Sequence, residues 1–114
     1  MASIETAENQ GNEELVTRYY RNDYDEVKVI IEKIVKRNDY ALVHVNDDFG
    51  EFLVEDETFT IIIKVMSITP IQTAIDFCVT NKKLFKNCKH VIVAWYKALD
   101  ESLQFLGKGM NKDG

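Results

Sequence analysis

Residues Thr58–Thr80 read TFTIIIKVMSITPIQTAIDFCVT. Apolar side chains alternate with their neighbours along two runs, and a turn containing Pro70 separates these runs. A period of two is typical of β-strands, so the stretch predicts a β-hairpin with one markedly apolar face. An isolated hairpin is marginal in water, and we expect the helices on either side in sequence to cover that face.

The register of this hairpin predicts which side chains lie on its other face. With Thr69, Pro70 and Ile71 in the loop, Ile68 stands opposite Gln72. An ion pair between strands supports this register over its neighbours. Such a face is more apolar than a fully solvated one usually is, which makes it a candidate surface for self-association or for a protein partner. The pairs predicted there are Ile62 with Cys78, Lys64 with Asp76, and Met66 with Ala74.

Two amphipathic helices flank the predicted strands. The first begins at Asp23, which with Glu26 forms a capping box, and it ends at Asn38-Asp39. Its buried stripe has the i, i+3, i+4, i+7 spacing of one helical face. That stripe consists of Val27, Ile30, Ile31, Ile34 and Val35.

The second helix is predicted from about residue 83 to a stop at Gly107. Four lysines near its start are unfavourable at the positive end of a helix dipole. Either the regular helix starts nearer Asn87, or these lysines pair with the acidic turns between strands. The predicted stripe is Leu84, Phe85, Cys88, Val91, Ile92, Trp95, Leu99, Leu103 and Leu106.

Shorter strands are predicted over residues Tyr40–Val45 and Glu51–Val54, with a turn at Gly50 between them. The element order is therefore α-β-β-β-β-α. This order predicts an α+β fold, a two-layer sandwich in which a four-stranded antiparallel meander carries both helices on one face.

Length and composition indicate one domain. The chain has 114 residues, 46% of them apolar and 29% charged. We expect a mostly disordered polar leader over residues 1–22, a single domain over 23–107 and a flexible tail over 108–114. The net charge of −5 argues against a nucleic-acid or anionic-membrane binder. No apolar run is long enough to span a bilayer.

Motifs for catalysis, cofactors or metals are not found. The sequence has no P-loop, dinucleotide-binding glycine pattern, HExxH or GxSxG. His44 and His90, with Cys78 and Cys88, show no metal-ligand spacing, and two cysteines make no disulfide framework. The acidic turns lack calcium-loop spacing, so a solvated role is the simpler interpretation. We therefore predict no cofactor, no metal site and no enzymatic activity.

The most distinctive charged feature is a basic patch of Lys82, Lys83, Lys86 and Lys89. A phosphate or nucleic-acid contact is one interpretation. Attraction to the acidic turns of the same chain, or simple solubility, is favoured because the rest of the chain is acidic.

The pattern resembles small bacterial cell-envelope lipoprotein domains, including the helix-grip domains of outer-membrane-assembly lipoproteins. The resemblance covers about residues 23–106 in element order and hydrophobic spacing, without a diagnostic motif. It implies a cell-envelope location if a signal preceded the chain; otherwise a cytoplasmic one is expected. The segments that resemble the family are Tyr24-Asp25-Glu26-Val27, Asn38-Asp39-Tyr40, Phe59–Val65 with its partner strand, and Trp95-Tyr96-Lys97-Ala98-Leu99.

Three functions remain open from the sequence. A non-enzymatic interaction or accessory module, using the open sheet face to bind a protein partner or a second copy, is favoured. The alternative is a carrier of a small apolar ligand held between the C-terminal helix and the sheet. An enzyme with a site of ordinary polar residues is the third, since fold alone does not decide function.

Overall fold

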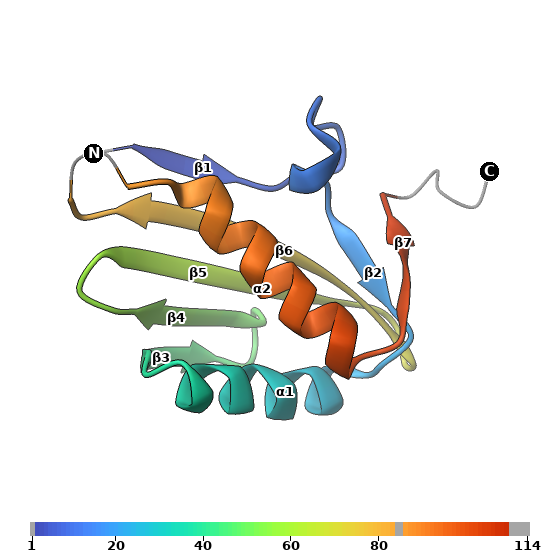
Figure 1. Cartoon of the computed structure of the whole chain (residues 1–114). Coiled ribbons are helices and arrows are strands. Elements are labelled where there is room, and N and C mark those ends of the chain that lie inside the picture. The colour runs from blue at the N-terminus through green and yellow to red at the C-terminus, as the bar shows by residue number, and fades with distance from the viewer. Residues whose placement is uncertain (1, 84–85, 110–114) are drawn as a thin grey trace.

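An antiparallel sheet forms one layer of the protein and two helices form the other (Figure 1). The computed structural model describes residues 2–83 and 86–109. Within them the fold is α+β, as predicted, but the sheet has seven strands, not four. The strands are β1 (Ser3–Glu5), β2 (Arg18–Tyr20), β3 (Ala41–Asn46), β4 (Glu51–Glu55), β5 (Phe59–Thr69), β6 (Gln72–Asn81) and β7 (Phe105–Lys108), and the helices are α1 (Tyr24–Arg37) and α2 (Cys88–Ser102).

Strands β3 to β6 form the predicted meander, and the hairpin of β5 and β6 is its centre. The predicted pairs of Lys64 with Asp76 and of Ile62 with Cys78 are confirmed. The prediction near the loop was wrong, because Gln72 pairs with Thr69 and the register shifts after Ser67. A bulge accommodates one extra residue, so Ile68 has no partner directly opposite.

The β3–β4 turn is held tightly against the hairpin. Gly50 has φ +67°, and its carbonyl accepts a hydrogen bond from the Val65 amide at 2.8 Å. A Cβ at position 50 would lie 2.0 Å from the Val65 carbonyl oxygen. Both the positive φ and the close backbone approach therefore require glycine.

Helix α1 confirms the capping prediction. The Asp23 side chain accepts from the Glu26 amide, and the Glu26 side chain accepts from the Asp23 amide. The helix ends with Asn38 at the cap position. Val27, Ile31, Ile34 and Val35 are buried, while Ile30 lies half-buried against the core.

Helix α2 is shorter than predicted at both ends. It begins at Cys88, with the Asn87 side chain accepting from the His90 amide, which agrees with the alternative start near Asn87. Predicted stripe members Leu84 and Phe85 lie outside the described residues. The helix ends at Ser102, because residues from Phe105 onward pair with β2 as strand β7. Leu103 caps the helix and Leu106, predicted as helical, lies on β7 with 50% of its surface exposed.

The prediction of a disordered leader was wrong for the described residues 2–22. β1 and β2 both pair antiparallel with the outer edge of β6, β1 with Cys78–Thr80 and β2 with Thr73–Ile75. An open edge presents unpaired N–H and C=O groups, and these two short strands satisfy them. The tail prediction was wrong at Lys108, which belongs to β7.

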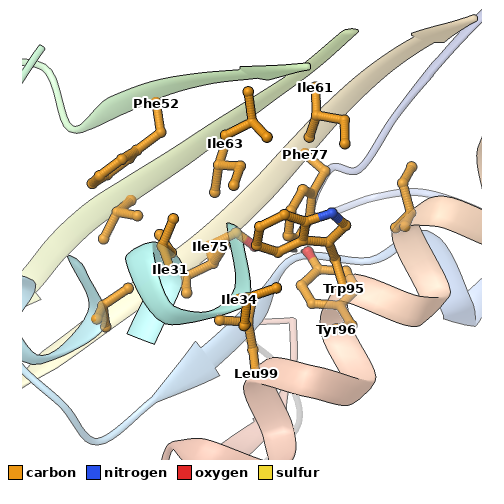
Figure 2. Close-up of a cluster of buried hydrophobic side chains, with 14 of the residues drawn as sticks. Ile31, Ile34, Phe52, Ile61, Ile63, Ile75, Phe77, Trp95, Tyr96 and Leu99 are labelled. Carbon is orange, nitrogen blue, oxygen red and sulfur yellow. Dashed lines mark hydrogen bonds between the residues drawn. The ribbon is translucent and has the colours of Figure 1, made fainter. Parts of the chain in front are cut away.

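The core lies between the helices and one face of the sheet (Figure 2). Trp95 is 2% exposed, and its ring centroid lies 5.8 Å from that of Phe77 and 5.6 Å from that of Tyr40. The rings of Tyr96 and Phe77 pack edge-on, with their centroids 4.9 Å apart. The other face of the sheet has no helix over it in the described part of the chain.

Candidate functional site

The open face of the sheet, opposite the helices, has an apolar row across its centre. The strand register aligns Leu53 of β4, Ile62 of β5 and Cys78 of β6 side by side. Their neighbours in sequence, such as Phe52, Ile61 and Phe77, are fully buried in the core, so the parity of the strands directs this row outward. All three side chains are partly exposed.

A charged row runs beside the apolar row. It aligns Glu51, Lys64 and Asp76, with Lys64 between the two acids. The predicted ion pair of Lys64 and Asp76 is not formed within the described residues. Instead, Asp76 Oδ1 accepts hydrogen bonds from the hydroxyls of Thr6 at 2.5 Å and Thr17 at 2.7 Å.

Asp76 thereby anchors the connection between β1 and β2. Thr6 and Thr17 flank a loop that leaves the sheet and returns, and an isolated bridge between Ala7 and Val16 closes it. Burial is the main cause that raises the pKa of Asp76, although the two threonine hydroxyls oppose the shift. The Asp76 carboxylate therefore holds the β1–β2 connection in place and also forms part of the charged row on the open face.

The remaining predicted surface residues differ in accessibility. Met66 is 38% exposed, but Ala74 is only 1% exposed. Ala74 lies between Met66 of β5 and Tyr19 of β2, with which it pairs, and it is not part of the accessible surface. Cys78 and Cys88 are free thiols, and burial raises the pKa of both. Neither thiol has the lowered pKa that marks a reactive cysteine.

The basic patch does not form one surface with free ammonium groups. Lys82 Nζ lies 3.3 Å from Glu55 Oε1 and donates to the Asp56 carbonyl at 2.6 Å. Lys89 Nζ lies 2.8 Å from Glu14 Oε1. These contacts agree with attraction to acids of the same chain, while Lys83 and Lys86 remain exposed.

The acidic turns line an open hollow of about 710 Å³ near the start of β3. Its charged lining consists of Asp39, Glu55, Asp56, Glu57 and the Lys82 ammonium group. Within residues 2–83 and 86–109, no group of three or more His, Cys, Asp or Glu side chains is placed to hold a metal ion. Nor is any helix of the described chain long and apolar enough to cross a membrane.

A partly buried ion pair that the sequence did not predict joins β2 to α2. Arg18 Nη1 donates to Asp100 Oδ2 at 2.6 Å, and the Tyr20 hydroxyl donates to Asp100 Oδ1 at 2.7 Å. The Arg18 guanidinium lies 4.4 Å from the ring centroid of Tyr96 and 5.6 Å from that of Phe105. Burial, followed by the hydrogen bond to Asp100, raises the pKa of Tyr20.

This cluster is largely closed to solvent. Arg18 is 8% exposed and Tyr20 is fully buried, so a substrate could not reach them without opening the fold. Its signal in the sequence was the β-prone segment Val16-Thr17-Arg18-Tyr19-Tyr20. The open face therefore remains the candidate site.

Comparisons with models of known protein families, with curated proteins and with solved structures returned no match. The resemblance to envelope lipoprotein domains stays a prediction.

Proposed function

We propose that this protein is a non-enzymatic interaction module that binds a protein partner on the open face of its sheet. The observation that supports the proposal is the apolar row of Leu53, Ile62 and Cys78, which no described element covers. Met66, 38% exposed on the same face, adds apolar surface further along β5, with Lys64 between it and Ile62. Contiguous apolar surface rimmed by polar groups is typical of protein-binding sites.

The carrier alternative has less support. A ligand between α2 and the sheet would occupy the place that the rings of Trp95, Tyr96 and Phe77 fill (Figure 2). Tyr96 also donates a hydrogen bond to the Ile75 carbonyl at 2.7 Å. Opening this space would separate aromatic contacts and break that bond. Ligand carriage stays a prediction that no observation favours.

The proposal is tested by selecting peptides from a random displayed library on the immobilised protein. The variant Ile62→Lys with Met66→Glu changes the open face without changing net charge. Val29→Lys with Ala94→Glu is the matched control, because both positions are exposed on the helices. Circular dichroism and thermal unfolding establish that both variants fold.

We expect most selected peptides to bind the open-face variant at least about tenfold more weakly and the helix control within about twofold, since tenfold corresponds to 1.4 kcal/mol. Peptides that bind both variants as they bind the unmodified protein would place the interaction elsewhere and overturn the proposal.

A further inference from the structure

The charges around the apolar row decide which kind of partner fits it. Glu5 of β1 pairs with Cys78, which places its carboxylate at the end of the row. Glu51 and Asp76 lie in the neighbouring charged row, on either side of Lys64. Three carboxylates to one ammonium group give these four side chains a net charge of −2. Glu8, which accepts the Tyr19 hydroxyl bond, adds a further acid near Asp76.

A second copy of this chain is a poor occupant of such a surface. Stacking two open faces would bring two sets of carboxylates together, with a single lysine on each side to offset them. Like charges facing each other across an interface disfavour association. The whole chain also carries a net charge of −5, so two copies repel at long range. Nucleic acid and anionic lipid carry the same sign and are disfavoured for the same reason.

The size of the surface suits one helix. The apolar row spans three strands, about 10 Å at a strand spacing of about 4.8 Å. An α-helix with its side chains is about 10–12 Å in diameter. From Ile62 to Met66 the surface extends about 13 Å along β5 at about 3.3 Å per residue. The exposed Lys64 lies between these two residues on this face, so an apolar stripe that contacts both passes beside the Lys64 side chain.

We propose that the open face binds a cationic amphipathic helix of another protein, with the apolar stripe of that helix on Leu53, Ile62 and Met66 and its Lys or Arg side chains beside Glu5 and Glu51. This inference rests on the proposed function and specifies its partner. As in other recognition of amphipathic helices, apolar anchors would provide affinity and flanking charges would provide specificity.

The test uses three fluorescent 18-residue peptides. One has Leu and Lys in an amphipathic helical pattern, one has the same composition in scrambled order, and one has Leu and Glu in the amphipathic pattern. Fluorescence anisotropy is measured against the unmodified protein at low and high salt. The variant Glu5→Lys with Glu51→Lys removes the open-face acids, and Glu32→Lys with Glu101→Lys makes the same charge change on exposed helix positions.

We expect the Leu–Lys helix to bind the unmodified protein, with an affinity that falls as salt rises. Glu5→Lys with Glu51→Lys should weaken this binding at least tenfold, and the helix-surface control should weaken it less than threefold. The Leu–Glu peptide should not bind, and the scrambled peptide should bind at least tenfold more weakly.

Other results overturn the inference in distinguishable ways. Equal binding of the scrambled peptide, or equal weakening by both charge variants, would mean attraction to an acidic protein and not recognition by this face. Failure of the Leu–Lys helix to bind would overturn the inference alone. A dimer in analytical ultracentrifugation that Ile62→Lys with Met66→Glu dissolves would overturn it while upholding the interaction surface. If Ile62→Lys with Met66→Glu binds the Leu–Lys helix as tightly as the unmodified protein does, the result would contradict both this inference and the proposed function.

Discussion

Removing the Asp100 carboxylate should destabilise the protein more than any change at a surface charge. Asp100 accepts hydrogen bonds from Arg18 at 2.6 Å and from the Tyr20 hydroxyl at 2.7 Å. The Arg18 side chain is 10% exposed and that of Asp100 is 26% exposed. Arg18 Nε is already buried without a hydrogen-bond partner. Asp100→Ala would therefore leave a buried cation and a buried hydroxyl without their acceptor.

The magnitude follows from these exposures. Removing one partner of a buried ion pair costs about 3–5 kcal/mol. Water can reach the partly exposed Asp100 side, which places the expected loss at the lower end, about 3 kcal/mol. This is a large share of the roughly 5–15 kcal/mol that stabilises a typical domain. Equilibrium urea unfolding measures it, with Trp95 fluorescence as the probe because Trp95 is the only tryptophan and is 2% exposed.

A double-mutant cycle separates the ion pair from the packing of the arginine. Arg18→Met keeps an apolar chain between the Tyr96 and Phe105 rings and removes the charge. In the Arg18→Met, Asp100→Ala double variant no buried charge is left unpaired, so its loss should be at least about 1 kcal/mol smaller than the sum of the single losses. Glu101→Ala, the exposed neighbour on α2, is the control and should change stability by less than about 0.5 kcal/mol. A loss below about 1 kcal/mol for Asp100→Ala, or additive single losses, would refute the reasoning.

Two further predictions concern the β3–β4 turn and the Asp76 anchor. Gly50→Ala should lower the free energy of unfolding, measured in urea, by more than about 3 kcal/mol, because its Cβ would lie 2.0 Å from the Val65 carbonyl oxygen. Gly11→Ala is the control, since a Cβ there would have nothing within 4 Å, and it should change the free energy of unfolding by less than about 0.5 kcal/mol. Burial raises the folded-state pKa of Asp76 above its ordinary 3.8, so its proton-linked stabilisation is complete below that pH and is lost as pH rises through the raised value. Asp76→Asn keeps an acceptor oxygen for the two threonines and cannot ionise. It should therefore be more stable than the unmodified protein at pH 7, and this gain in stability should disappear near pH 4. A stability difference that does not vary with pH would contradict this prediction.

The sequence was sufficient for the elements whose signals are local. The hairpin of β5 and β6 alternates over many residues, and a slip of one residue would have turned its apolar face to water. The start of α1 was predicted because the capping pair Asp23 and Glu26 is three residues apart. The bulge near Ile68 was not predicted, because the loop chemistry at Pro70 does not specify where an extra residue is accommodated.

The elements that were missed depend on contacts between distant parts of the chain. Strands of three residues, such as Ser3–Glu5 and Arg18–Tyr20, are too short to show a period, and they form because β6 offers an unpaired edge. Leu99, Leu103 and Leu106 keep helical spacing, which concealed the end of α2 at Ser102. The backbone N–H and C=O groups of the residues after the helix form hydrogen bonds with β2 in place of those of another helical turn.

These additional strands also determine which part of the open face can bind a partner. Strand parity alone predicts Ile62, Met66, Ala74 and Cys78 to be equally accessible on the open face. Ala74 is buried beside β2, and Asp76 accepts hydrogen bonds from Thr6 and Thr17, so the accessible apolar surface lies nearer β4 and includes Leu53. β1 adds the Glu5 carboxylate at the other end of the row. Of the acids proposed to select a cationic partner over a second copy, Glu5 is therefore placed by N-terminal pairing, and its position could not have been inferred from the hairpin alone.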